Sequence, residues 1–154
     1  AENIDTDNGT INHQYVLGID GSNPTNFPAV YHCNNLGEGW RLPTVNEVKE
    51  LVKTYYGVTE DLVQNQTYYG VEPYSKHASD FENIMATIAE DNQDSADINE
   101  AKIAMAGTTW YWTGQGDTAT KKIKRVKLAQ KYSVGAAGAT NVNFVRCVRD
   151  VVLK

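Results

Sequence analysis

Apolar side chains recur at helical spacing in the segment 44–57. Thr44 and Glu47 form a capping box at its start, because each side chain can bond the backbone N–H of the other residue. Gly57 can close the helix. The predicted apolar face carries Val45, Val48, Leu51, Val52 and Tyr55. The segment therefore predicts an amphipathic helix that begins after Thr44 and ends at Gly57.

A shorter helix is predicted between Asn26 and Gly37. Asn26 can cap this helix, Pro28 is tolerated in a first turn, and glycine commonly closes a helix. The apolar residues on one face, spaced i, i+4, i+7, are Ala29, Cys33 and Leu36. We therefore expect Cys33 to face the core.

A third helix is predicted to begin at a second capping box and to run to about Glu90. The box consists of Ser79 and Glu82. The apolar residues of this helix are Phe81, Ile84, Met85 and Ile88. An acidic connector follows at 91–100, which we expect to be a solvated loop.

The remaining segments carry strand and turn patterns. The apolar run 15–19 predicts a terminal strand within a polar N-terminal segment, 1–22, that is otherwise typical of a linker. Three strands are predicted in the second half of the chain, at 109–113, 121–132 and 141–152. A turn is predicted at the glycine-rich segment 114–117 and a flexible loop at 135–138. Helices followed by an antiparallel sheet indicate an α+β fold.

The length and charge of the chain refine this picture. Its 154 residues fit a single domain, 1–154, with enough chain to bury a core. The net charge of −5 conceals two unequal parts. Residues 1–117 hold 5 Lys/Arg and 18 Asp/Glu, a net charge of −13, whereas residues 118–154 hold 9 Lys/Arg and 1 Asp/Glu, a net charge of +8. Because the apolar runs are short, we expect no membrane span.

The basic part is concentrated in one short segment. Its cationic residues are Lys121, Lys122, Lys124, Arg125, Lys127 and Lys131. Three interpretations are open: a solvated strand edge whose lysines deter aggregation, a contact for a sulfated polysaccharide or other polyanion, and pairing with the acidic region 80–100. Nucleic acid is not an expected partner, because the chain is net acidic and has no nucleic-acid motif.

Cys33 and Cys147 are the two cysteines of the chain. They are compatible with two separate buried thiols or with one disulfide. A zinc site is not expected, because there is no CxxC and the three histidines are scattered along the sequence. Adjacency of His32 and Cys33 is no evidence for a catalytic pair, since neighbouring side chains mostly point to different faces.

Three motifs follow one another in a specific order: GWRLPT at 39–44, WYWT at 110–113 and FVRCVRD at 144–150. Over about 27–150, the chain resembles the C-terminal domain family of bacterial collagen-like adhesins, which has a C-type-lectin-like fold. The resemblance implies two or three helices packed on a small antiparallel sheet with long loops. The RLPT element is also similar to one in formylglycine-generating enzymes, which share the fold but need a catalytic cysteine pair that is absent here.

The resemblance also implies roles for individual residues. The family has a cysteine ahead of WRLP and another in the final strand, which Cys33 and Cys147 match. It therefore implies a disulfide between them and an oxidising, extracellular location at the bacterial cell surface. Structural roles are expected for the motif residues Trp40, Arg41, Leu42, Pro43 and Thr44. Among them, Trp40 and Leu42 would be core wedges, and Arg41 a hydrogen-bonding or stacking residue.

A ligand surface is expected on the strands and loops of residues 112–143, because loops on a rigid scaffold carry function. Variable proteins of diversity-generating retroelements use the same fold, and their diversified positions lie just upstream of a motif similar to FVRCVRD. The predicted contacts are Trp112, Gln115, Asp117, Lys122, Lys124, Lys127, Tyr132, Asn141 and Asn143. Calcium-dependent lectins carry Glu-Pro-Asn or Gln-Pro-Asp and then Trp-Asn-Asp; this chain has Glu-Pro-Tyr at 72–74, so we expect no metal or cofactor.

Together, the residues and the resemblance predict an exported, non-catalytic ligand-recognition or adhesin module of a bacterial surface protein. Its ligand would be a host or environmental glycan or protein. The first alternative is a tip or structural subunit of a fibre, and the second is an enzyme of the formylglycine-generating type.

Overall fold

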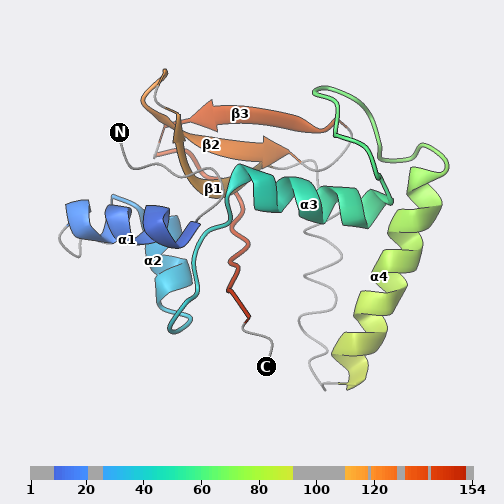
Figure 1. The fold of residues 1–154 in the computed structure, drawn as a ribbon, viewed down its shortest axis with the longest axis horizontal. Helices are drawn as coiled ribbons and strands as arrows, with labels where there is room; N and C mark the ends of the chain where they lie inside the picture. Colours follow the sequence, from blue (N-terminus) through green and yellow to red (C-terminus); the bar gives the residue numbers. More distant parts are fainter. Residues whose placement is uncertain are drawn as a thin grey trace. The chain divides into compact units, whose positions relative to one another are not determined.

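The protein has an α+β fold with four helices and one three-stranded antiparallel sheet among its described residues (Figure 1). The computed structural model describes residues 9–20, 26–91, 110–117, 119–127, 131–138 and 140–151. The helices are α1 (Gly9–Asp20), α2 (Pro28–Asn34), α3 (Val45–Tyr56) and α4 (Tyr74–Asp91). The strands are β1 (Trp110–Asp117), β2 (Lys122–Lys127) and β3 (Ser133–Ala137), in that order across the sheet. In the part of the chain with described coordinates, no helix is long and apolar enough to cross a membrane.

The chain divides into two compact units, which are described separately. Unit 1 comprises Ala1–Val48, Trp110–Val126 and Val134–Lys154, and unit 2 comprises Lys49–Thr109 and Lys127–Ser133. Helix α3 begins in unit 1 and continues into unit 2. The predicted acidic connector, 91–100, falls almost wholly outside the described residues.

The core of unit 1 is built from α2, the RLPT segment and the sheet. Its buried members are Val30, Cys33, Leu42, Trp112 and Ala137. Val16 and Leu17 of α1 and Ile123 of β2 pack against this cluster. A disulfide joins Cys33 to Cys147, which confirms the pairing that the resemblance implied. Cys33 is fully buried, as the spacing in the sequence predicted, whereas Leu36 is exposed.

The capping box at Thr44 is confirmed. The Thr44 hydroxyl accepts a hydrogen bond from Glu47 N at 3.2 Å, and a Glu47 carboxylate oxygen accepts one from Thr44 N at 2.9 Å. The other two helix starts differ from the prediction. Phe27, not Asn26, stands at the N-cap of α2. Helix α4 begins at Tyr74, and Ser79 lies inside it with its hydroxyl bonded to Ser75 O.

The terminal strand predicted at 15–19 is wrong, because this run lies within helix α1. A short apolar run has no period of its own that separates a strand from a helix. The helical turn places Asn12 and Val16 four residues apart on one side, and these residues are respectively buried and partly buried. Packing of these side chains within unit 1 therefore decides the conformation.

Two glycine-rich segments predicted as a turn and a loop are strands. Strand β1 continues through residues 114–117, where Gly114 N donates to Pro43 O at 2.9 Å. Strand β3 includes Gly135, which lies beneath the ring of Trp110: a Cβ added at Gly135 would be 3.2 Å from that ring. Glycine here makes room for a close aromatic contact rather than for a turn.

The last predicted strand, 141–152, is not a regular strand in its described part. It makes two isolated bridges, a parallel one between Tyr111 and Phe144 and an antiparallel one between Arg41 and Val148. Because successive residues pair with two different segments, no continuous ladder forms.

Unit 2 is held by an aromatic cluster. Tyr55 and Tyr56 at the end of α3 meet edge to face, with ring centroids 4.8 Å apart, and Tyr56 stacks on Tyr68 at 5.7 Å. The Tyr55 hydroxyl donates to a carboxylate oxygen of Glu82 in α4. Burial raises the pKa of Tyr56 to about 12, so this residue stays neutral in the cluster.

Breaking the disulfide is expected to lower the free energy of unfolding by about 5 kcal/mol, because it closes a long loop in the unfolded chain. The two cysteines are 114 positions apart in sequence. Urea unfolding of the oxidised protein with and without dithiothreitol measures the effect. The double variant Cys33→Ala/Cys147→Ala is the control and should not respond to dithiothreitol. An unfolding midpoint of the native chain that reduction leaves unchanged would contradict the prediction.

Candidate ligand-binding site

A largely apolar cavity of about 230 Å³ lies in unit 1. Its walls come from α1, the start of α2, the RLPT segment, β1 and the neighbouring residues of β2 and the C-terminal segment. The residues that line it are Asn12, Tyr15, Val16, Asn26, Phe27, Pro28, Ala29, Val30, Leu42, Trp112, Thr113, Gly114, Gln115, Gly116, Ile123 and Asn141. None of these residues carries a charged side chain.

Strand β1 supplies one wall of the cavity, including the polar side chains of Thr113 and Gln115. Trp112 and Thr113 are buried there, and the Thr113 hydroxyl donates to Lys124 O of β2 at 2.8 Å. The same hydroxyl accepts a hydrogen bond from Gln115 N at 3.2 Å. The hydroxyl proton of Thr113 and one of its lone pairs are therefore used within the sheet.

Gln115 ties β1 to the start of α3. Its side-chain oxygen accepts a hydrogen bond from Val45 N at 3.1 Å, and the residue is 4% exposed. The first N–H groups of a helix have no partner inside the helix, so this bond satisfies one of them. The position of the side-chain amide is thereby fixed next to the cavity.

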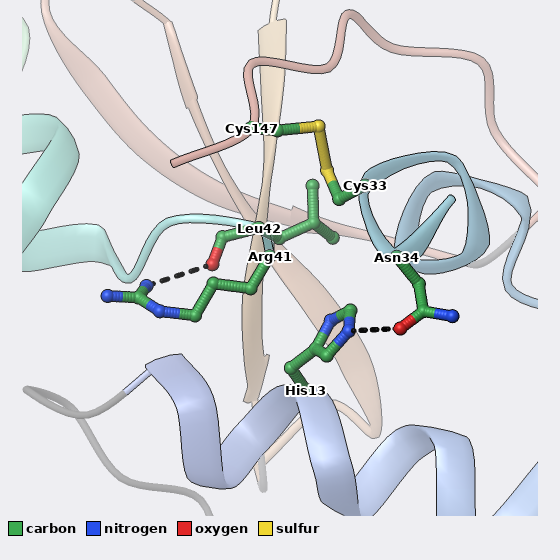
Figure 2. The surroundings of a disulfide bond; sticks show 6 residues. All are labelled: His13, Cys33, Asn34, Arg41, Leu42 and Cys147. Carbon is green, nitrogen blue, oxygen red and sulfur yellow. Dashed lines mark hydrogen bonds between the residues drawn. A yellow bond between two sulfur atoms is a disulfide. The ribbon is translucent and has the colours of Figure 1, made fainter. Parts of the chain in front are cut away.

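Helices α1 and α2 form further walls of the cavity. His13 of α1 lies within hydrogen-bond distance of Asn34 of α2, with Nε2 and Oδ1 3.2 Å apart (Figure 2). The exposed residues Asn26, Pro28 and Asn141 also line the cavity, which therefore reaches the surface. Asn141 is held in its turn by two hydrogen bonds to Gly138 O, from its backbone N at 3.0 Å and from its side chain at 3.1 Å.

Leu42 and Arg41 lie beside the disulfide. Figure 2 shows the Leu42 side chain pointing toward the Cys33–Cys147 bond, while the Arg41 side chain extends away from it. Arg41 is buried, with 4% of its surface exposed, and its guanidinium donates a hydrogen bond to Leu42 O at 3.3 Å. Arg41 is thus the structural hydrogen-bonding residue that the sequence predicted.

Two carboxylates compensate the buried charge of Arg41. Glu47 binds it through two hydrogen bonds, at 2.7 and 2.9 Å, and Asp150 through one at 3.0 Å. Burial raises the pKa of Glu47, but the hydrogen bonds from Arg41 and Thr44 outweigh it and leave that pKa below its usual value. Glu47 is therefore both the capping residue of α3 and the main partner of Arg41.

Three of the predicted contact residues, Trp112, Gln115 and Asn141, line this one cavity. Trp112 is buried, so its ring forms a wall rather than an exposed contact. Asn143 is not among the lining residues and accepts a hydrogen bond from Arg125 at 3.1 Å, while Arg125 stacks over Trp110 at 4.4 Å.

Four predicted contacts lie in strands β1 and β2. Asp117 accepts hydrogen bonds from Thr120 Oγ1 and Ala119 N, and the bond from Thr120 lowers the pKa of Asp117. The lysines Lys122, Lys124 and Lys127 belong to β2. Because β2 is the central strand of the described sheet, the edge position in the first interpretation of this segment is wrong, whereas its exposure to solvent holds for Lys122.

Tyr132 belongs to unit 2 and is 2% exposed. Its backbone N donates to Gln66 O at 2.9 Å and its O accepts from Asn65 N at 2.7 Å. Burial raises the pKa of Tyr132 to about 12. The structure therefore buries this residue within unit 2, so the prediction of an exposed ligand contact at Tyr132 is wrong.

The sequence analysis did not identify the part of the cavity wall that α1 forms. Asn12, Tyr15 and Val16 belong to a segment that was predicted as a strand or linker. The spacing of Asn12 and Val16 fits one face of a helix, but a buried asparagine gives no signal in a search for apolar periodicity. Gly114 and Gly116 were missed because they were predicted to form a turn.

Similarity to known proteins does not assign a function to this site. Comparisons with protein-family models, curated proteins and solved structures give no significant match. Among the described residues, no group of three or more His, Cys, Asp or Glu is placed to hold a metal ion.

Glu47→Gln is expected to lower the free energy of unfolding by about 2 kcal/mol at neutral pH, because it removes a hydrogen-bonded charge from Arg41. The pKa of Glu47 is lower in the folded state, so its contribution is present above the unfolded pKa and is lost as pH falls through the folded one. Stability of the native chain should therefore decrease below about pH 4.5 more steeply than that of the variant. Urea unfolding across this range measures both.

The control for this prediction is Glu50→Gln. Glu50 lies on the same helix, but its carboxylate is exposed and pairs with Lys53 at 3.7 Å. Its replacement should change the free energy of unfolding by less than about 1 kcal/mol. Equal effects of the two variants would contradict the role given to Glu47.

Proposed function

We propose that this chain is an exported, non-catalytic ligand-recognition module of a bacterial surface protein, of adhesin type and with a C-type-lectin-like fold. It binds a glycan or a protein through the strands and loops of residues 112–143. The observation that carries this proposal is that Trp112, Gln115 and Asn141, predicted as contacts from the sequence, line one cavity that reaches the surface.

The scaffold around this cavity supports recognition without large rearrangement. The Cys33–Cys147 disulfide and the Arg41 ion pairs hold the segments next to Leu42, which itself lines the cavity. A preorganised site loses less entropy on binding, which favours affinity. The disulfide also supports export, because such bonds persist in oxidising compartments.

The disulfide disfavours the enzyme alternative. Both cysteines of the chain are oxidised in it, and no free cysteine is present. Thiolate is the reactive form of cysteine, so chemistry of the formylglycine-generating type would require this buried bond to be reduced first.

A fibre tip or subunit, with another protein as partner, is the second candidate function. It is favoured by two apolar side chains near the cavity residue Asn141: Val142 is 96% exposed and Phe144 is 47% exposed. Exposed apolar residues of this kind contribute to the centre of protein interfaces.

Screening the intact protein against glycan and surface-protein arrays tests the main proposal. For any ligand that is retained, Asn141→Ala should weaken binding by about tenfold, the effect of losing a contact worth about 1.4 kcal/mol. Asn83→Ala on α4, an exposed asparagine in unit 2, is the matched control and should bind as the native chain does. The proposal fails if no ligand is retained, or if both variants bind it with unchanged affinity.

A polyanion ligand gives a separate expectation. If the lysines of β2 contact a sulfated polysaccharide, the protein should be retained on heparin, and retention should fall steeply with salt because the charges are exposed to solvent. Lys122→Ala/Lys124→Ala should then elute at lower salt, whereas Lys49→Ala/Lys76→Ala, which removes two lysines elsewhere, should change elution less. Elution of the native chain at low salt, as for any protein of net charge −5, would exclude this ligand class.

A further inference from the structure

The cavity has chemical properties that narrow its ligand further. We propose that it takes a small, uncharged, mainly apolar molecule or group that presents one hydrogen-bond acceptor to the side-chain nitrogen of Gln115. This inference rests on the proposed function, since it names the ligand class for part of the same site.

The size of the cavity is sufficient for a substituted ring. Its volume is about 230 Å³. An engineered apolar cavity of about 150 Å³ in another protein stays dry and binds benzene. A mainly apolar lining favours an apolar occupant, because the apolar surfaces of both leave water when the ligand enters.

The lining excludes charged ligands. None of the described Lys, Arg, Asp or Glu residues lines the cavity. A charged group entering it would lose its hydration without gaining an ion pair, which is strongly unfavourable. The cavity is in this respect unlike the lysines of β2, which suit an anion.

Gln115 supplies a buried polar contact. Because Val45 N–H is a donor, the atom of the Gln115 amide that faces it must be the oxygen, and the other atom is the NH₂ donor. We find no partner for this nitrogen among the described residues. Thr113, the neighbouring polar residue of the wall, already donates to Lys124 O. One donor on a 4% exposed residue therefore selects an acceptor on the ligand.

Three probes of similar shape separate these requirements: acetophenone, isopropylbenzene and benzoate. Acetophenone has a ring and a carbonyl acceptor, isopropylbenzene replaces the carbonyl oxygen by a methyl group, and benzoate carries a charge. Titration of the ¹⁵N-labelled protein, followed by NMR, should give the order acetophenone, then isopropylbenzene, then benzoate. Acetophenone should shift the Gln115 side-chain Nε2 resonance and the backbone resonances of Gly114 and Gly116.

Two variants and a control assign the binding to the cavity. Gln115→Glu keeps an oxygen for Val45 N–H but removes the donor. It should therefore weaken the binding of acetophenone by about tenfold and that of isopropylbenzene by less. Ala29→Leu adds volume to the lining and should abolish binding of both neutral probes. Leu36→Ala, at an exposed position outside the lining, should bind both as the native chain does.

The result that would overturn the inference is specific. Neutral probes that leave these resonances unshifted, neutral probes that bind Ala29→Leu normally, or benzoate that binds as well as acetophenone would each contradict it. If the probes fail but an array ligand is bound and is lost in Asn141→Ala, the inference fails and the proposed function stands. If the probes bind and no array ligand is found, the proposed function fails and the assignment of the cavity stands.

Discussion

The ion pairs of the buried Arg41 guanidinium are the interactions on which the site depends most. A buried charge is costly unless it is paired and hydrogen-bonded, and Arg41 meets both conditions through Glu47 and Asp150. Its backbone also exchanges two hydrogen bonds with Val148, at 2.9 and 2.8 Å. One residue thus fixes the start of α3 and the C-terminal segment to the same point.

The residues that follow Arg41 connect it to the cavity, to β1 and to α3. Leu42 lines the cavity, Pro43 O accepts a hydrogen bond from Gly114 N, and Thr44 caps α3. The Leu42 side chain points toward the disulfide (Figure 2). The disulfide stabilises the fold differently from the ion pairs of Arg41, because its effect comes mainly from restricting the unfolded chain. Ion pairs that depend on pH and a covalent bond that depends on redox state therefore support the same wall of the site.

The parts of the fold that the sequence predicted are those that depend on local chemistry or on a motif. The capping box of Thr44 and Glu47 needs only residues three apart, and it is present as predicted. The disulfide followed from the resemblance. Residues whose state depends on distant partners were misjudged: Tyr132 is buried beside residues 65–66. Gly135 lies in a strand and makes room for the ring of Trp110, and no sequence pattern around 135–138 predicts that contact. For the same reason Gln115 was found as a contact residue without its bond to Val45.

The position of the disulfide in the sequence has a mechanical consequence. Tension applied to the two ends of the chain passes along the backbone to Cys33, across the sulfur–sulfur bond and out from Cys147. All three strands and the whole of α3 and α4 lie between these cysteines in sequence and are shielded from that load. Helix α1 precedes Cys33 and remains in the loaded part of the chain. Because α1 forms one side of the cavity, pulling on the chain would open the cavity before it disturbs the sheet.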